Sequence, residues 1–68
     1  MTGQRIKQLR KKKNLAQCEL AVRSGFTQSK ISKIERGILR LKLDDLIPIA
    51  KALGVTVAEL LDEEEQTA

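Results

Sequence analysis

Two short helical segments on either side of a glycine constrain this 68-residue chain more than any other feature. The stretch 15–37 reads LAQCELAVRSGFTQSKISKIERG. Its first half has the apolar spacing of an amphipathic helix over about 17–24, and Gly25 supplies the positive φ that a tight turn requires. Thr27 is a suitable N-cap for a second helix over about 27–36. The segment therefore predicts two helices joined by a tight turn.

The rest of the chain has the same helical character. Its β-branched residues are scattered at helical spacing and never alternate as in a strand, so the predicted fold class is all-α, a compact domain of five helices. The predicted helices cover about 2–13, 17–24, 27–36, 43–53 and 56–61, the last opening with a capping box. We expect one domain over 1–68, with its core in 4–61 and a disordered acidic tail at 62–68.

Pro48 is the residue that fits this pattern least well. Inside the helix predicted over 43–53 it removes an amide donor and crowds the carbonyl of Asp44. Either the helix starts later or it kinks near Asp44 and Asp45. The apolar spacing that continues across Pro48 favours a kink.

Composition narrows the function classes. No apolar run approaches the ~20 residues that a bilayer span needs, and the N-terminus lacks the apolar core of a signal peptide, so we expect a cytoplasmic protein. The chain has no histidine and one cysteine, Cys18, for which an incidental thiol is favoured over a redox role. Because Cys18 has no neighbouring base, we do not expect an enzyme, and without histidine there is no His-based metal site. No metal, cofactor or small-molecule site is predicted.

The charge is divided unevenly along the chain. Residues 1–42 carry twelve Lys and Arg against two Glu, a net charge of +10, whereas residues 43–68 carry one Lys against seven acidic residues, a net charge of −6. This asymmetry is typical of a polyanion-binding half joined to a half that faces away. An ordinary solvated surface with an acidic tail would give the same totals, so charge alone does not decide.

The outer face of the predicted helix 27–36 carries residue types that read DNA bases, as in a helix-turn-helix motif. Glutamine can pair with adenine, lysine can donate to guanine, and serine lets the backbone approach. We therefore expect Gln28, Ser29 and Lys33 to read base edges, with Ser32 in second place. A purely structural helix can also have a polar outer face, but the residue types favour contact with DNA bases.

A second group of residues is expected to contact phosphates. The amides that open the helix 17–24 can face a phosphate, and Gln17 adds a side-chain donor. The further candidates, each of which could equally be a solvated or capping group, are Thr27, Lys30, Arg36, Arg40, Lys42 and Arg10.

Arg10 and Glu35 are expected to form a structural ion pair. Arg10 follows Ile6 by four residues and Glu35 follows Ile31 by four, so both charges share the inward faces of their helices. Because a lone buried charge is very costly, two opposite charges on buried faces should meet. The pair would hold the first helix against the third.

The segment after Gly37 is unusually apolar for a connection. Ile38, Leu39 and Leu41 either fold back onto the core or join Val57 and Leu61 in a two-fold dimer interface. We favour the dimer.

Three stretches within 4–61 carry several motifs in register: RIKQLRKKKNLAQCELA, GFTQSKISKIERG and IAKALGVTVAELL. Together they resemble the Cro/cI-type (XRE) helix-turn-helix family, which includes the lambdoid phage repressors. The resemblance implies a five-helix DNA-binding domain, usually dimeric, that reads a pseudo-palindromic operator. Carried over position by position, it implies DNA contacts at Gln17, Gln28, Ser29 and Lys33 and an ion pair between Arg10 and Glu35.

The chain departs from the family pattern in three places, one of which is the apolar set Ile38, Leu39 and Leu41, where the family is polar. Ala16 stands where the family has a Ser, Thr or Asn N-cap, a loss of about 1 kcal/mol. Leu41 and Lys42 replace the usual Pro-Ser before the fourth helix.

The leading hypothesis is a sequence-specific transcriptional regulator that binds double-stranded DNA as a homodimer. The alternative is a protein-interaction module on the same fold, such as an antitoxin-like or coactivator subunit, against which the basic outer face of the helix 27–36 argues.

Overall fold

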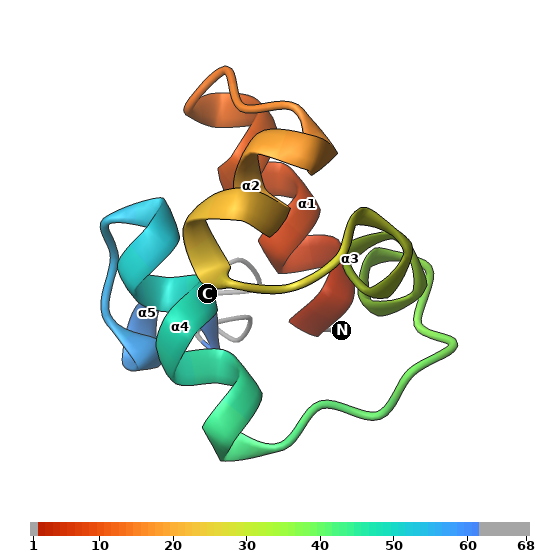
Figure 1. Cartoon of the computed structure of the whole chain (residues 1–68). Coiled ribbons are helices and arrows are strands. Elements are labelled where there is room, and N and C mark those ends of the chain that lie inside the picture. The colour runs from red at the N-terminus through yellow and green to blue at the C-terminus, as the bar shows by residue number, and fades with distance from the viewer. Residues whose placement is uncertain (1, 62–68) are drawn as a thin grey trace.

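The structure, a computed structural model, describes residues 2–61 and contains five helices in that range (Figure 1). They are α1 (Thr2–Lys12), α2 (Gln17–Ser24), α3 (Gln28–Glu35), α4 (Leu43–Leu53) and α5 (Val57–Leu60). The described part has no strand, so the all-α prediction is confirmed. No helix in it is long and apolar enough to cross a membrane. The predicted acidic tail, 62–68, lies outside the described residues.

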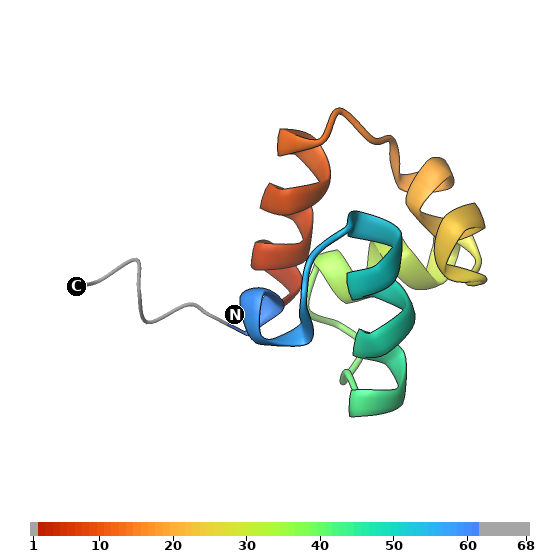
Figure 2. The ribbon, with the colours of Figure 1, turned by 90° about the vertical axis from the view of Figure 1, so that its left-hand side faces the viewer.

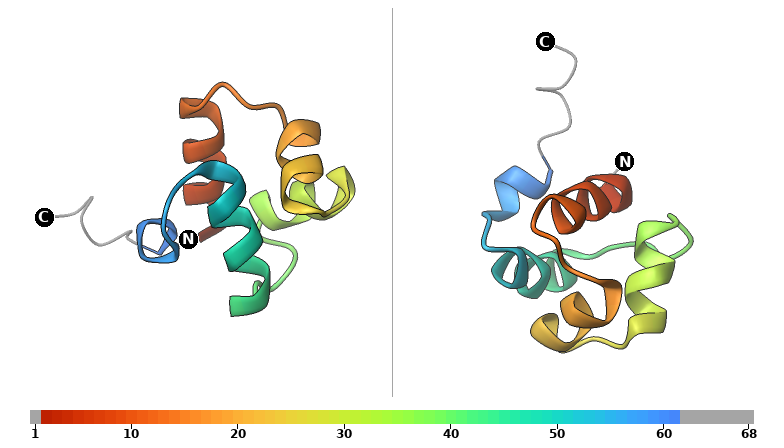
Figure 3. Two further views of the ribbon diagram at one scale, coloured as in Figure 1. Left: turned by 60° about the vertical axis from the view of Figure 1, so that its left-hand side comes forward. Right: turned by 90° about the horizontal axis from the view of Figure 1, so that it is seen from above.

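The helices enclose one hydrophobic core to which all five contribute. In Figure 2 α5 and α2 lie on opposite sides of the domain, and in the left-hand view of Figure 3 α5 lies beside the N-terminal end of α1, against which it packs. The fully buried large side chains are Ile6, Leu20, Ile31, Ile34, Ile49, Leu53 and Leu60. Ile31 and Ile34 of α3 are three residues apart, and Ile49 and Leu53 of α4 are four apart, so this part of the core follows from the amphipathic pattern of the sequence.

The connection between α2 and α3 is the tight turn that the sequence predicts. Gly25 has φ 80°, and the amide of Phe26 donates to the carbonyl of Ala21 over 2.9 Å, which closes the end of α2. Thr27 Oγ1 accepts a hydrogen bond from the amide of Lys30 over 3.1 Å. Thr27 is therefore the N-cap, as predicted, and α3 ends at Glu35, one residue earlier than expected.

The start of α2 differs in part from the expectation. Ala16 has no side chain that could cap the helix, as predicted. Glu19 Oε1, however, accepts a hydrogen bond from the backbone amide of Ala16 over 2.8 Å, which is half of a capping box. The sequence contains the signal for this contact, a Glu three residues after the cap position, and our interpretation missed it.

Helix α4 begins at Leu43 and continues through Pro48, so the alternative in which it starts later is wrong. The amide of Lys42 donates to Asp45 Oδ2 over 3.3 Å and fixes the first turn. The next helix, α5, opens with the predicted capping box, in which the amide of Glu59 donates to Thr56 Oγ1 over 3.1 Å. The amide of Thr56 donates to Glu59 Oε1 over 3.1 Å in return.

Gly3 is a structural residue that the sequence analysis missed. It is buried where α1 meets the C-terminal end of α3, and a Cβ at this position would overlap the carbonyl oxygen of Ile34. Only glycine allows this close approach of two backbones. Gly3 therefore sets how closely α1 packs against the helix that carries the expected base-reading residues.

Candidate nucleic-acid interface

The outer face of α3 presents the side chains that we expect to read bases. Ile31 and Ile34 of this helix lie in the core, whereas Gln28, Ser29 and Lys33 are exposed. Ser32 lies half-buried between these two faces. The arrangement leaves amide, hydroxyl and ammonium groups free on one helix face, and these groups can pair with base edges.

Behind this face, a buried network joins α1, α2 and α3. Arg10 Nε lies 2.7 Å from Glu35 Oε2, and Arg10 Nη2 lies 3.1 Å from Glu35 Oε1. Arg10 Nη1 donates to the carbonyl of Leu15 over 2.7 Å. The two charges that the sequence places on inward faces thus meet in a two-pronged ion pair, the strongest hydrogen-bonding geometry for Arg and a carboxylate.

Gln17, the first residue of α2, belongs to the same network. Its Nε2 donates to Glu35 Oε1 over 3.0 Å, and the residue is half-buried. Sequence reasoning assigned Gln17 to a phosphate and did not foresee this contact. The contact joins residues 18 positions apart, a separation at which sequence spacing gives no signal.

Two of the expected phosphate contacts are engaged inside the domain instead. Arg10 is 8% exposed, and three of its nitrogens donate within the protein, so its guanidinium is occupied inside the domain. Lys30 Nζ lies 3.3 Å from Asp45 Oδ1 and 4.2 Å from the centre of the Phe26 ring. The phosphate role expected for Arg10 is thus corrected, because its buried charge is stabilised by internal partners; the Lys30 side chain is 36% exposed and pairs with Asp45 near the surface.

Asp45 is held ionised by its position at the start of α4. The amide of Lys42, donating to the Asp45 carboxylate, lowers the pKa of Asp45, and the hydrogen bond from Lys30 lowers it further. The contact of 3.3 Å between Lys30 and Asp45 joins α3 to the first turn of α4.

The remaining phosphate candidates stay at the surface. Thr27, Arg36, Arg40 and Lys42 are all exposed. Arg36 Nε makes a weak contact of 3.4 Å with the carbonyl of Ser32. These side chains lie at the two ends of α3 and on the segment before α4.

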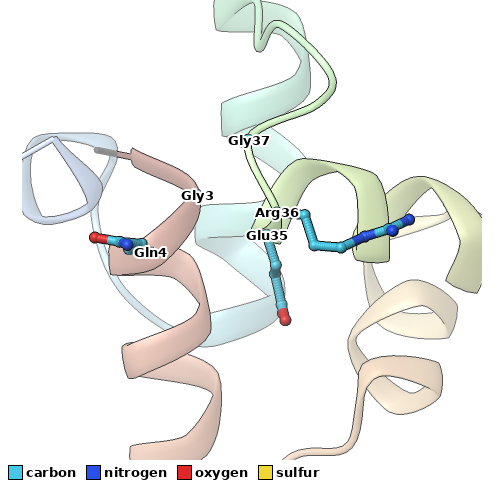
Figure 4. Close-up of a pocket in the computed structure, with 5 residues that line it drawn as sticks. All are labelled: Gly3, Gln4, Glu35, Arg36 and Gly37. Atoms are coloured by element: carbon cyan, nitrogen blue, oxygen red, sulfur yellow. The ribbon is translucent and has the colours of Figure 1, made fainter.

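A pocket of about 210 Å³ lies where the start of α1 meets the end of α3 (Figure 4). It is lined by Gly3, Gln4, Glu35, Arg36 and Gly37. The Gln4 and Arg36 side chains diverge from each other instead of converging on the space between them (Figure 4). The pocket is smaller than cavities that hold drug-sized ligands.

The apolar connection after α3 is divided between core and surface. Leu41 and Val57 are partly buried against the core. The fold-back alternative is therefore correct for Leu41, and only part of the Val57 side chain is left for the expected dimer interface. Ile38, Leu39 and Leu61 remain exposed. Leu43 and Ile47 of α4, which the sequence analysis did not single out, are exposed as well.

Helix α2 also has an exposed side. Val22 is 80% exposed and the thiol of Cys18 is free. Among residues 2–61, His, Cys, Asp and Glu side chains form no group that could hold a metal ion.

Comparison with known proteins identifies the architecture. The helix-turn-helix family model matches residues 6–60. The chain belongs to the helix-turn-helix family. Because the proteins of this family are DNA-binding transcriptional regulators, the helix-turn-helix chain is a DNA-binding regulator and not an enzyme, as the sequence predicts.

Individual relatives agree with this assignment. The control protein C.BamHI of Bacillus amyloliquefaciens is 43% identical over 61 residues, which are 88% of this chain and 75% of the relative. A crystal structure of SinR, the master regulator for biofilm formation, in complex with DNA has a TM-score of 0.85 and 41% identity, covering 91% of this chain and 100% of that one. The DNA-binding domain of the P22 C2 repressor has a TM-score of 0.88 and 30% identity, covering 94% of this chain and 84% of that one.

Proposed function

We propose that this helix-turn-helix chain binds a specific double-stranded DNA site as a homodimer, with α3 in the major groove, and so regulates transcription. Its compartment in this proposal is the cytoplasm. The observation that carries the proposal is the contrast between the two faces of α3. The inner face is fixed in the core, and the outer face offers Gln28, Ser29 and Lys33 without an internal partner among residues 2–61.

The contacts divide into readers and anchors. In the proposal, Gln28 and Lys33 bond to base edges, Ser29 lets the backbone approach, and Ser32 is a secondary contact. The anchoring set that binds phosphates comprises Gln17, Thr27, Arg36, Arg40 and Lys42. Arg10 and Lys30 are left out because they are occupied inside the domain.

The homodimer is supported by the exposed apolar side chains around the α3–α4 connection. Ile38 is 64% exposed and Leu43 is 62% exposed. Ile47 follows Leu43 by four residues and so lies on the same side of α4. With Leu39 and Leu61 these side chains give a second copy an apolar surface to cover, and a two-fold arrangement would place two α3 helices about 34 Å apart.

The proposal is tested by selecting bound sites from random double-stranded DNA and by sedimentation of the protein alone. We expect an enriched motif with two-fold symmetry, half-sites about 10 base pairs apart, and affinity that falls steeply with salt. Leu43→Lys should shift a dimer to a monomer, whereas Val22→Lys, on the exposed side of α2, should leave the dimer unchanged.

Two results would count against it. Salt-sensitive binding without an enriched motif would leave only non-specific attraction to DNA. A monomer at high micromolar concentration that binds no DNA site would favour the protein-interaction module, for which the same exposed apolar residues would be the contact surface.

A further inference from the structure

We infer that Glu35 is a positioning residue for DNA binding, because its buried carboxylate fixes the side-chain amide of Gln17 at the start of α2 before DNA arrives. The inference rests on the proposed function, in which Gln17 contacts a phosphate. It gives the Arg10–Glu35 pair a second role beyond holding α1 against α3.

The geometry makes Glu35 a rigid acceptor. The residue is 6% exposed, and its carboxylate accepts from Arg10 Nε at 2.7 Å and from Arg10 Nη2 at 3.1 Å. The same guanidinium donates to the carbonyl of Leu15 over 2.7 Å, just before α2 begins. A carboxylate held on one side by a buried guanidinium has little freedom to turn, so the oxygen that faces α2 has a fixed position.

That oxygen determines which way the Gln17 amide faces. An ionised carboxylate only accepts hydrogen bonds, so it favours the NH₂ end of the amide and repels the carbonyl end. Nε2 accordingly lies 3.0 Å from Glu35 Oε1. An NH₂ group has two donors, and among the described residues the Gln17 side chain makes no second hydrogen bond. One N–H remains for a phosphate oxygen at the start of α2.

Ordering the side chain in advance raises affinity for DNA. A glutamine side chain that rotates freely in the unbound protein loses rotamer freedom when it binds a phosphate. The entropy lost in ordering one such side chain during binding lowers the affinity by about two- to tenfold. Glu35 removes that loss from the binding step, because the amide is already held in the free protein.

The first test uses the free protein and needs no DNA. The ¹⁵N order parameter of the Gln17 side-chain amide should be well above about 0.6, the range of flexible groups, whereas Gln8, an exposed glutamine on α1, should fall below it. In Arg10→Met/Glu35→Met, which removes both buried charges together so that neither is stranded, the Gln17 amide should become as mobile as that of Gln8. A mobile Gln17 amide in the native protein would overturn the inference, and this reading does not depend on the double variant folding.

The second test uses the duplex obtained by site selection, with one phosphate at a time replaced by a neutral methylphosphonate. In the native protein, one position in each half-site should weaken binding through loss of the Gln17 contact. That position-specific effect should disappear in Gln17→Met, which keeps the ion pair and the length of the side chain. In Arg10→Met/Glu35→Met it should shrink, with an affinity loss of about two- to tenfold for each half-site, while Gln8→Met should behave like the native protein.

If Glu35 had only a structural role, Arg10→Met/Glu35→Met would lower the affinity by the same factor whichever phosphate is replaced. That result would overturn the inference. An unchanged effect at the same phosphate in the double variant would overturn it too. If the native protein selects no duplex, the proposed function fails, whereas the order parameter in the free protein still tests whether Glu35 holds Gln17.

Discussion

Replacing Arg10 with methionine should destabilise the domain strongly. Arg10→Met keeps an apolar stem in place of the first four side-chain atoms but strands the buried Glu35 carboxylate, which loses the contacts of 2.7 and 3.1 Å and keeps only the Gln17 amide. Removing one partner of a buried pair costs on the order of 3–5 kcal/mol. For a domain of this length, whose total stability is roughly 3–10 kcal/mol, that is a large fraction.

The assay is thermal and urea unfolding followed by far-ultraviolet circular dichroism. A loss of this size corresponds to a Tm lower by about 12–40 °C, with a matching fall in the urea midpoint. Arg10→Met/Glu35→Met is the diagnostic partner variant: with both charges gone, methionines can fill the space, and most of the stability should return. Lys12→Met, on the exposed side of α1, should stay within about 0.5 kcal/mol of the native protein.

An unchanged midpoint for Arg10→Met would refute the reasoning, because the Glu35 carboxylate would then tolerate isolation in the core. A double variant less stable than Arg10→Met would refute it as well, since the loss would then come from packing and not from a stranded charge.

Three other substitutions test particular contacts by urea unfolding. Gly3→Ala should lower the free energy of unfolding by about 1–3 kcal/mol, because its Cβ overlaps the carbonyl of Ile34, although alanine favours helices elsewhere; a stabilised variant would contradict the close packing. Ala16→Ser should raise the free energy of unfolding by about 1 kcal/mol, because the serine hydroxyl would accept a hydrogen bond from a backbone amide in the first turn of α2. An unchanged free energy would mean that these amides gain nothing from a side-chain cap. Asp45→Asn should be less stable than the native chain at neutral pH. The folded pKa of Asp45 lies below its ordinary value of 3.8, so the difference in free energy of unfolding should be fully present above pH 3.8 and vanish as the pH falls through the folded pKa. A difference independent of pH would exclude the ion pair with Lys30 as its cause.

Local patterns in the sequence were enough to predict most of the fold. Helix positions follow from apolar spacing, and the turn at Gly25 and the caps at Thr27 and Thr56 each depend on residues that are close in sequence. The Arg10–Glu35 pair is a long-range contact that was still predictable. Each charged residue follows a core isoleucine of its own helix by four positions, and this spacing places it on the inward face.

The contacts that escaped prediction depend on how the helices are placed relative to one another. Nothing near Lys30 in the sequence indicates that Asp45 comes within 3.3 Å, since the two residues meet only when α3 and α4 pack. Gly3 looks like an ordinary helix residue until α1 meets the end of α3. Whether Leu41 folds inward was an open alternative for the same reason. The base-reading assignment of Gln28, Ser29 and Lys33 stays a prediction.

The most direct test of sequence-specific readout by α3 is site selection from random DNA, repeated with Lys33→Ala and with Lys51→Ala as a matched control. Lys33 is exposed on α3, and Lys51 is exposed near the end of α4. We predict that the native protein and Lys51→Ala select the same two-fold symmetric motif. Lys33→Ala should lose its preference at one symmetry-related position in each half-site, a relaxation of about 1–3 kcal/mol at that position. An identical motif from all three proteins, or no motif from the native protein, would contradict the claim that the outer face of α3 reads the sequence.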